Sequence, residues 1–450
     1  FFRIKISVYC FLMRLVIAFI LLTVTSLLSA TDYYVKNGGN DSNSGLDDAN
    51  AWAHHPWMST WTGRVTLEPG DVVYMKRGDK WICANPVDDF ITVQQSGTQG
   101  KPIKTTSYGQ GEKPIISIST NSNFCVIQGN TQSYISIDNL EISHWSPLID
   151  QSSNKCGIQF GGYESNIPHD WVITSCDIHN CPKIGISGYG DSYNIVIGDI
   201  NATTCATPTS YSNQIYNCGY AGILLGGCNY LTQNSNFQVY HNYIHDINVL
   251  GSLGQNAYGC AVSASSNASG LPRYVTMRYN YVSDVPTWEG LDAHGGRYIY
   301  FLDNYIKNCH FGINVQAAII SSHTPVLDQI FIEGNTIEAN ASLDARYFIL
   351  IQGNRDDYQP KNINILNNTL FFSTRSRDIS SYGIKLGASD GVLVEGNKIY
   401  NGNIDASGGA IQVVRTKNAI IRRNFFLDWF GSIYLDTSSI NGKIDIYNNI

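Results

Sequence analysis

A repeated pattern of apolar residues around a fixed asparagine constrains the fold of this chain more than any other feature. One copy of the pattern apolar-x-apolar-x-x-Asn-x-apolar consists of Phe237, Val239, Asn242 and Ile244. Further copies centre on Asn280, Asn304, Asn335, Asn368, Asn397 and Asn424, with a partial copy at Asn449. The 207 residues from Asn242 to Asn449 span seven intervals, or about 30 residues per repeat. Earlier copies are degenerate and have Cys176 and Ile200 in the asparagine position.

A second pattern, Gly-apolar-x-apolar, recurs between the asparagine copies. Clear copies begin at Gly157, Gly185, Gly222, Gly259, Gly290, Gly312 and Gly383, and variant copies begin at Phe348, Ala410 and Ser432. Each repeat therefore contains at least two short strands with period-two alternation, separated by Gly and Asn turns. Strands this short cannot bury their apolar face alone, but stacking them into a coil buries a continuous column of Ile, Val and Leu.

These two patterns together predict an all-β fold, a parallel β-helix of about ten coils. Asparagines at one fixed position can stack as a ladder of side-chain amides. A leucine-rich repeat is excluded because no helical period follows the strands. A propeller is the alternative, although its blades need four antiparallel strands joined by hairpin turns.

Composition excludes two other classes of protein. Hydrophobic residues make up 43% of the 450 residues, which is enough for a large core and excludes global disorder. Lys and Arg number 29 against 36 Asp and Glu, for a net charge of −7. We therefore expect no nucleic-acid partner, because no basic surplus exists to neutralise phosphates.

The first thirty residues have the pattern of a secretory signal peptide. An apolar run from Leu15 to Leu28 follows Arg14 and ends in the small residues Ser29 and Ala30, with Met13 as the expected start. We expect residues 1–30 to be removed and the mature protein to be secreted, periplasmic or on the cell surface. A retained N-terminal anchor is the alternative. No later run is apolar and long enough to span a bilayer.

An exported chain can oxidise its cysteines, and the mature part contains ten of them. Cys176 and Cys181 lie close together in the sequence and are the best disulfide candidates. No Cys/His set has zinc-binding spacing, so a structural zinc site is not expected. Asp356 and Asp357 in QGNRDD could bind calcium, which is the one cofactor that the sequence leaves open.

Residues 31–120 carry a different set of motifs, which read YYVKNGGNDSNSG, LEPGDVVYMKRGDKW and SGTQGKPIKTTSYGQGEKPII. This segment resembles the N-terminal module of secreted bacterial right-handed parallel β-helix proteins. Their pectate lyase-like superfamily includes polysaccharide lyases and mannuronan C5-epimerases. The resemblance implies an N-terminal β cap over 31–120, a repeat domain over 121–450 and a polysaccharide substrate. We expect a monomer, and we expect that the chain ends inside a coil and lacks its C-terminal part.

The best candidate site is the stretch Trp288-Glu289-Gly290-Leu291-Asp292-Ala293-His294. If Leu291 and Ala293 point inward, Asp292 and His294 share the outer face about 7 Å apart along the strand. Stacked coils then place the small residues Ala261 and Ser263 on one side of this pair, and Asn314 and Gln316 on the other. Trp288, His310 and Arg346, each two residues before the second pattern, share that face if the turn keeps its parity.

These residue types suit proton abstraction from C5 of a uronic acid. His294 can act as the base, with Asp292 orienting it. Arg346, His310, Asn314 or Gln316 could hold the substrate carboxylate, and a tyrosine such as Tyr258 could serve as the acid. Trp288 offers a flat apolar surface to a sugar ring. Lys385, three coils away, could contact substrate without sharing the proton step.

The Asp-x-His pattern resembles the Asp-Pro-His-Glu motif of mannuronan C5-epimerases, which implies that Asp292 and His294 are active-site residues. Ala293 replaces the Pro and Gly295 replaces the Glu of that motif. The leading prediction is β-elimination or C5-epimerisation of a uronate-containing polysaccharide. Glycoside hydrolysis by Glu289 and Asp292 is an alternative, although strand alternation would aim Glu289 inward or into the turn. A non-catalytic glycan-binding protein or adhesin is the other alternative.

Overall fold

The computed structural model describes residues 30–85, 90–119, 123–144, 155–161, 167–188, 190–226, 234–252, 254–263, 271–317, 327–339, 347–353, 359–373, 382–400, 408–429, 431–436 and 442–450. The predicted signal peptide lies outside these ranges except for Ala30. The described residues form strands and turns and no α-helix. Accordingly, they contain no helix with the length and hydropathy that crossing a bilayer requires.

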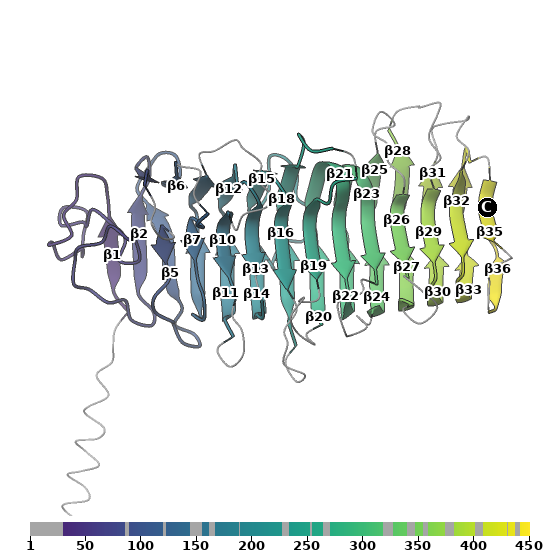
Figure 1. The fold of residues 1–450 in the computed structure, drawn as a ribbon, viewed down its shortest axis with the longest axis horizontal. Coiled ribbons are helices and arrows are strands. Elements are labelled where there is room, and N and C mark those ends of the chain that lie inside the picture. The colour runs from purple at the N-terminus through teal and green to yellow at the C-terminus, as the bar shows by residue number, and fades with distance from the viewer. Residues whose placement is uncertain are drawn as a thin grey trace, which may run out of the picture.

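The strands stack along one axis into an elongated rod, and the first column is a single parallel sheet of fourteen strands (Figure 1). Its strands are β1 (Asp32–Val35), β2 (Val72–Lys76), β5 (Ile103–Tyr108), β8 (Ile135–Asp138), β11 (His169–Thr174), β14 (Tyr193–Gly198), β17 (Phe237–Tyr240), β20 (Arg273–Arg278), β22 (Gly296–Leu302), β24 (Leu327–Glu333), β27 (Lys361–Leu366), β30 (Asp390–Glu395), β33 (Lys417–Arg422) and β36 (Ile444–Tyr447). Three of them, β1, β2 and β5, come from residues 31–120, so this segment continues the same sheet as the repeats.

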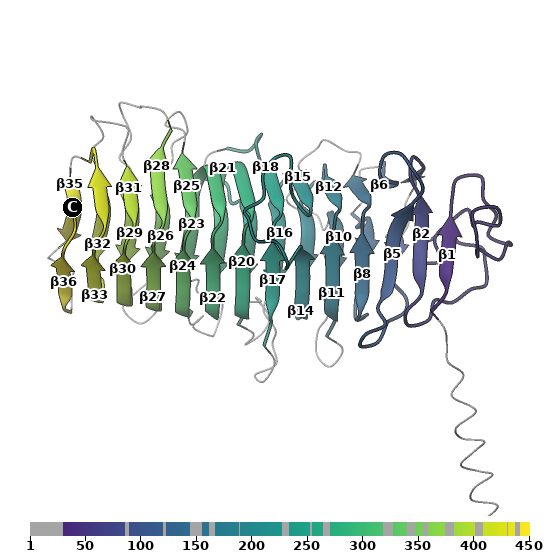
Figure 2. The ribbon, with the colours of Figure 1, turned by 180° about the vertical axis from the view of Figure 1, so that it is seen from behind.

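The second sheet forms two further columns, seen from behind in Figure 2. The second column contains β3 (Lys80–Cys83), β6 (Ile115–Ile118), β9 (Glu141–His144), β12 (Asp177–His179), β15 (Gln214–Cys218), β18 (Tyr243–Ile247), β21 (Tyr281–His294), β23 (Tyr305–Gln316), β25 (Thr336–Ala339), β28 (Thr369–Phe372), β31 (Lys398–Tyr400) and β34 (Phe425–Leu427). The third contains β4 (Ile91–Thr92), β7 (Ile127–Gln128), β10 (Cys156–Phe160), β13 (Ile184–Gly188), β16 (Ala221–Gly226), β19 (Tyr258–Ser263), β26 (Tyr347–Gln352), β29 (Tyr382–Gly387), β32 (Gly409–Val414) and β35 (Gly431–Asp436).

Strands β21 and β23 belong to both of these columns, because each runs without interruption around the corner between them. The first part of β21 pairs with β18 and the second part with β19. Every pairing between the named strands is parallel, as in β21 with β23. The architecture is therefore the predicted right-handed parallel β-helix, and the propeller alternative is excluded.

The predicted asparagine ladder runs through the coils as a chain of side-chain hydrogen bonds. Asn280 Nδ2 donates to Asn304 Oδ1 at 3.0 Å, and Asn304 Nδ2 donates to Asn335 Oδ1 at 2.9 Å. The ladder begins with Asn213, which is fully buried, and not with Ile200, which is 48% exposed. The assignment of Ile200 was wrong because residues 199–213 are inserted between β14 and β15 and carry the asparagine further along the chain.

The glycines that begin the copies of the Gly-apolar-x-apolar pattern stand where adjacent coils come close together. A Cβ atom on Gly259 would lie 2.5 Å from the carbonyl oxygen of Gly290, and one on Gly290 would lie 2.8 Å from that of Gly312. No side chain fits at these distances. This packing explains why the Gly-apolar-x-apolar pattern repeats.

The predicted disulfide between Cys176 and Cys181 is not formed, and both residues are free thiols. Cys176 occupies the asparagine ladder position, where its backbone N–H donates to Asn213 Oδ1. Cys181 lies around the next turn, where its side chain contacts Cys218. The two sulfurs therefore belong to different columns of the core, in which each is a small buried apolar group.

Candidate active site

The candidate site lies on the second part of β21. As predicted, Ala261 and Ser263 of the preceding coil are the strand partners of Asp292 and His294, and Asn314 of the following coil is the partner of Asp292. Leu291 and Ala293 point into the core, where both are fully buried.

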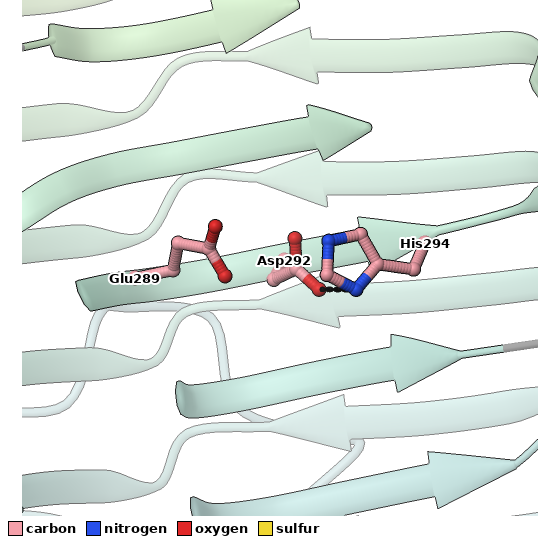
Figure 3. A group of neighbouring side chains, drawn as sticks. All are labelled: Glu289, Asp292 and His294. Carbon is pink, nitrogen blue, oxygen red and sulfur yellow. Dashed lines mark ion pairs between the residues drawn. The ribbon is translucent and has the colours of Figure 1, made fainter. Parts of the chain in front are cut away.

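Glu289 lies on the same side of the strand as Asp292 and His294, as Figure 3 shows. One side-chain atom of each residue lies within 4.8 Å of the others. The prediction that strand alternation aims Glu289 inward or into the turn was therefore wrong. Strict alternation fails because β21 turns the corner here, with a register irregularity between Val285 and Glu289.

The acidic side chains are more enclosed than a solvated outer face would suggest. Asp292 is 0% exposed and Glu289 is 1% exposed. The His294 side chain is 19% exposed, and its Nδ1 lies 3.4 Å from Asp292 Oδ2. The imidazole is therefore the member of the cluster that solvent and a ligand can reach.

Asn314 joins the two carboxyl groups. Its Nδ2 donates to Glu289 Oε1 at 2.7 Å and to Asp292 Oδ1 at 3.0 Å. An amide nitrogen carries two hydrogens, so it can satisfy both carboxyls at once. The sequence placed Asn314 beside Asp292 and left open whether it holds substrate, and the structure shows it engaged within the protein.

Burial is the main influence on the electrostatics of this cluster. Burial raises the pKa of Asp292 to about 6, against the opposing effects of His294 and Asn314. Burial, and then the charge of Asp292, raise the pKa of Glu289 well above its usual range. Burial and the same Asp292 charge raise the pKa of Tyr258, which keeps its proton at neutral pH.

Tyr258 lies beside the cluster on the preceding coil. Its strand partner is Glu289, and its ring meets the ring of His294 edge-on with centroids 6.0 Å apart. Its hydroxyl group contacts that of Tyr220. The structure thus places near His294 the tyrosine that the sequence could name but could not position.

Trp288 and His310 come together as predicted, with their rings stacked at a centroid distance of 5.9 Å. His310 is buried and also packs on Phe311, with ring centroids 4.4 Å apart. Trp288 is partly buried against the core and meets Phe311 edge-on. Trp288 and His310 therefore form one side of the site, next to the carboxyl groups of Glu289 and Asp292.

The remaining predicted site residues lie further along the rod. Asn314, Leu350 and Lys385 occupy the same strand position in successive coils, so Lys385 lies three coils from Asp292. Its Nζ donates to the hydroxyl of Tyr347 at 3.2 Å. Gln316 is half-buried at the end of β23, and Arg346 lies outside the described residues.

A row of side chains stands just before the glycines of the second sequence pattern or their equivalents, and only Tyr258 and Glu289 of this row were candidates from the sequence. This row comprises Tyr258, Glu289, Phe311, Tyr347 and Tyr382. Its signal was present as the aromatic residue before Gly259, Gly312 and Gly383, but strand alternation assigned that position to the wrong face.

Calcium does not match the ligands that this cluster offers. The spacing of Glu289, Asp292 and His294 would admit a cation. Calcium, however, takes six to eight oxygen ligands, whereas this group combines two carboxyls with an imidazole nitrogen. Asp356 and Asp357, the predicted calcium residues, lie outside the described residues.

Comparison with known proteins confirms the parallel β-helix fold that the resemblance implied. No protein-family model and no curated protein sequence matches the chain. One similar structure is the catalytic unit of a GH87 α-1,3-glucanase from Streptomyces thermodiastaticus, which is 12% identical with a TM-score of 0.57. The match covers 85% of this chain and 64% of that one, so this chain spans under two thirds of the glucanase unit.

Two further structures share the fold over most of both chains. The A-module of the mannuronan C-5 epimerase AlgE6 from Azotobacter vinelandii is 13% identical with a TM-score of 0.51, over 85% of this chain and 90% of that one. XylC in complex with xylose is 11% identical with a TM-score of 0.53, over 89% and 86%. At these identities the likeness establishes the fold and not the reaction.

Proposed function

We propose that this protein is an exported carbohydrate-active enzyme that removes the C5 proton of a uronic acid in a polysaccharide, leading to β-elimination or epimerisation. The observation that carries the proposal is the partly exposed His294, whose Nδ1 faces the buried Asp292 carboxyl at 3.4 Å. A carboxylate behind one ring nitrogen fixes the tautomer and leaves the other nitrogen as a base.

In the proposed reaction, Nε2 of His294 takes the C5 proton. The electron pair of the C–H bond passes to C5 and is stabilised by the sugar carboxyl group. In β-elimination the C4–O bond then breaks, a C4–C5 double bond forms, and the departing oxygen takes a proton from an acid. In epimerisation a proton returns to C5 from the opposite face. Tyr258 suits the acid because burial keeps it protonated and its ring contacts His294.

The substrate carboxylate also needs a neutralising partner. Lys385 is three coils away, and His310 is enclosed by Trp288 and Phe311. We propose Arg346 for this task, or a calcium ion held by the substrate carboxylate and by residues other than Glu289, Asp292 and His294. Activity assays with and without a chelator test the second option, because calcium dependence should appear as loss of activity that added Ca²⁺ restores.

Glycoside hydrolysis is the second candidate, and one observation favours it. Retaining hydrolases use two carboxyls about 5–5.5 Å apart, one of them protonated. Glu289 and Asp292 have oxygens within 4.8 Å, and both have a raised pKa. Against it, both carboxyls are almost fully buried, and His294 is the exposed member of the group.

A panel of alginate, pectin, glycosaminoglycans and neutral glucans separates these functions. New ultraviolet absorbance marks a lyase, reducing ends without absorbance mark a hydrolase, and a changed residue ratio alone marks an epimerase. His294→Ala should abolish lyase or epimerase activity while far-ultraviolet circular dichroism stays unchanged. A fully active His294→Ala variant contradicts the mechanism, and binding without any product favours the glycan-binding alternative.

A further inference from the structure

Two carboxyl groups that are buried side by side repel each other when both are ionised, so the protein must offset this repulsion. Glu289 and Asp292 are 1% and 0% exposed, and they share the amide nitrogen of Asn314 as a donor. In an enclosed site two carboxylates this close cannot both stay ionised. The pair must therefore carry a proton or bind a cation.

Within the part of the chain that the structure describes, the groups facing the pair supply little positive charge. They are His294 on β21 itself, Tyr258 and Cys260 on β19, Tyr220 next to β16, and Asn314 on β23, with His310 of β23 stacked on the neighbouring Trp288. Among the described residues, the contact with His294 is the one ion pair that either carboxyl makes. One imidazole cannot balance two negative charges, so one carboxyl holds a proton.

Hydrogen-bond donors decide which carboxyl keeps the charge. Asp292 receives the amide of Asn314 and the backbone N–H of Ala293, and faces His294. Glu289 receives Asn314 and the indole of Trp288, and it faces the charge of Asp292. Asp292 is thus the better-supported anion, and the proton falls to Glu289.

We propose that Glu289 is a positioning residue that stays neutral, sharing Asn314 with Asp292 so that a single negative charge faces His294. This inference rests on the proposed function, because it explains how His294 remains usable as a base. A single carboxylate facing Nδ1 favours the tautomer that leaves the lone pair on Nε2. A second carboxylate would add negative charge where the substrate carboxylate must bind.

Glu289→Gln tests the neutral role because glutamine keeps the shape and the Asn314 contact but can never ionise. We expect kcat/KM within about threefold of wild type at neutral pH, whereas Glu289→Ala should lose about 10- to 100-fold, as is typical when a supporting partner of an active-site group is removed. The pH profile adds a readout that a merely structural role would not move. Activity of the parent should fall once the pH exceeds the raised pKa of Glu289, because a second negative charge beside His294 repels the substrate carboxylate, and Glu289→Gln should lack that fall.

A second measurement does not depend on turnover. At neutral pH the infrared spectrum of the free protein should contain the carbonyl stretch of a protonated carboxylic acid, and Glu289→Gln should remove it. Glu338→Gln is the matched control, because Glu338 is a largely buried carboxyl on β25 that is held by Lys307. It should leave both the infrared band and the activity profile unchanged.

The outcomes separate this inference from the proposed function. A folded but inactive Glu289→Gln, beside an inactive His294→Ala, overturns the neutral role of Glu289 and leaves the His294 base in place. An active His294→Ala removes the proposed function, while the infrared band still decides whether Glu289 is protonated. Stoichiometric metal in the purified protein, or absence of the band, overturns the proton-sharing pair.

Discussion

Glu289 and Asp292 are three residues apart on β21, yet one oxygen of each lies within 4.8 Å of the other on the same side of the solenoid. In a regular strand, residues three apart face opposite ways. The register irregularity between Val285 and Glu289 marks the corner of β21, and Gly290 lies directly after it in close contact with Gly312 of the next coil. The chemistry of the site therefore depends on how tightly two coils can pack.

Gly290→Ala should damage the site without unfolding the chain. Its new Cβ would lie 2.8 Å from the Gly312 carbonyl oxygen and 2.9 Å from the Ile306 side chain. We expect β21 to shift away from β23, at a stability loss of about 1–3 kcal/mol, as for overpacking. Displacement of Glu289 and Asp292 by about 1 Å should reduce kcat by about 100-fold. Thermal melts and turnover assays measure the two effects.

Gly431→Ala is the matched control because it adds the same methyl group near the last described coil. The nearest atom to its Cβ would be the Gly408 carbonyl oxygen at 3.9 Å, an ordinary contact. This variant should melt and turn over like the parent. Equal behaviour of the two variants would show that the packing at Gly290 does not set the geometry of the site.

Lys385→Gln tests whether the substrate extends along the rod. Lys385 follows Asp292, Asn314 and Leu350 in one outward row, and its ammonium lies over the ring of Tyr347. A polyuronate bound along this row would lose one ionic contact. We expect KM to rise by about two- to fivefold with kcat unchanged, because exposed ionic contacts contribute about 1 kcal/mol or less. The KM of the parent should rise with salt, and an unchanged KM in the variant would place the substrate elsewhere.

The two repeated sequence patterns made the fold predictable, because each repeated position has one physical requirement. Asn304 must donate along the stack, and Gly290 must leave room for the next coil. The position of Ile200 shows the limit of such reasoning. An insertion after β14 places the asparagine of this coil at position 213, where it still stacks on Asn242. Counting residues along the chain cannot detect such an insertion, because the stacked column of asparagines is unchanged.

The candidate site was predictable only in part. Alternation correctly placed Asp292 and His294 together and Leu291 in the core. It misplaced Glu289, because alternation assumes a straight strand and β21 bends there. The enclosure of Asp292 was also beyond the sequence, since burial depends on neighbouring coils and not on strand parity.

The contribution of the carboxyl pair Glu289 and Asp292 to stability should fall as the pH rises through the range where the pair ionises. Folding raises the pKa of Asp292 from 3.8 to about 6 and that of Glu289 well above its usual value. The folded protein thus holds these protons more tightly than the unfolded chain does. The unfavourable contribution is absent below pH 4 and grows above it. The difference in melting temperature between the parent and Glu289→Gln from pH 4 to 8 should show this trend, because His55 and His144, whose pKa values are lowered by burial, change the stability of both proteins equally and in the opposite direction.

Glu338 provides a control of opposite sign. Burial raises the pKa of Glu338, but hydrogen bonds from Tyr305 and Lys307 outweigh burial, so that the pKa is lowered. The ionised Glu338 side chain therefore stabilises the folded protein at neutral pH, and this stabilisation is lost in acid. Glu338→Gln should therefore lower the melting temperature at pH 7 and have little effect near pH 3. If Glu289→Gln also destabilised the protein at neutral pH, Glu289 would be a favourable anion and not the neutral member of the pair.

Asn304→Ala should test how far the asparagine ladder holds the coils together. Asn304 Nδ2 donates to the Met277 carbonyl oxygen at 2.8 Å and to Asn335, while its Oδ1 accepts from the backbone and side chain of Asn280. Alanine would leave several of these buried groups unsatisfied, each at about 1–3 kcal/mol. We expect the free energy of unfolding, measured by chemical denaturation, to fall by at least about 2 kcal/mol.

Asn201→Ala, at an exposed position outside the ladder, is the control, and its free energy of unfolding should stay within about 0.5 kcal/mol of the parent. Similar losses in the two variants would mean that apolar stacking alone holds adjacent coils in register.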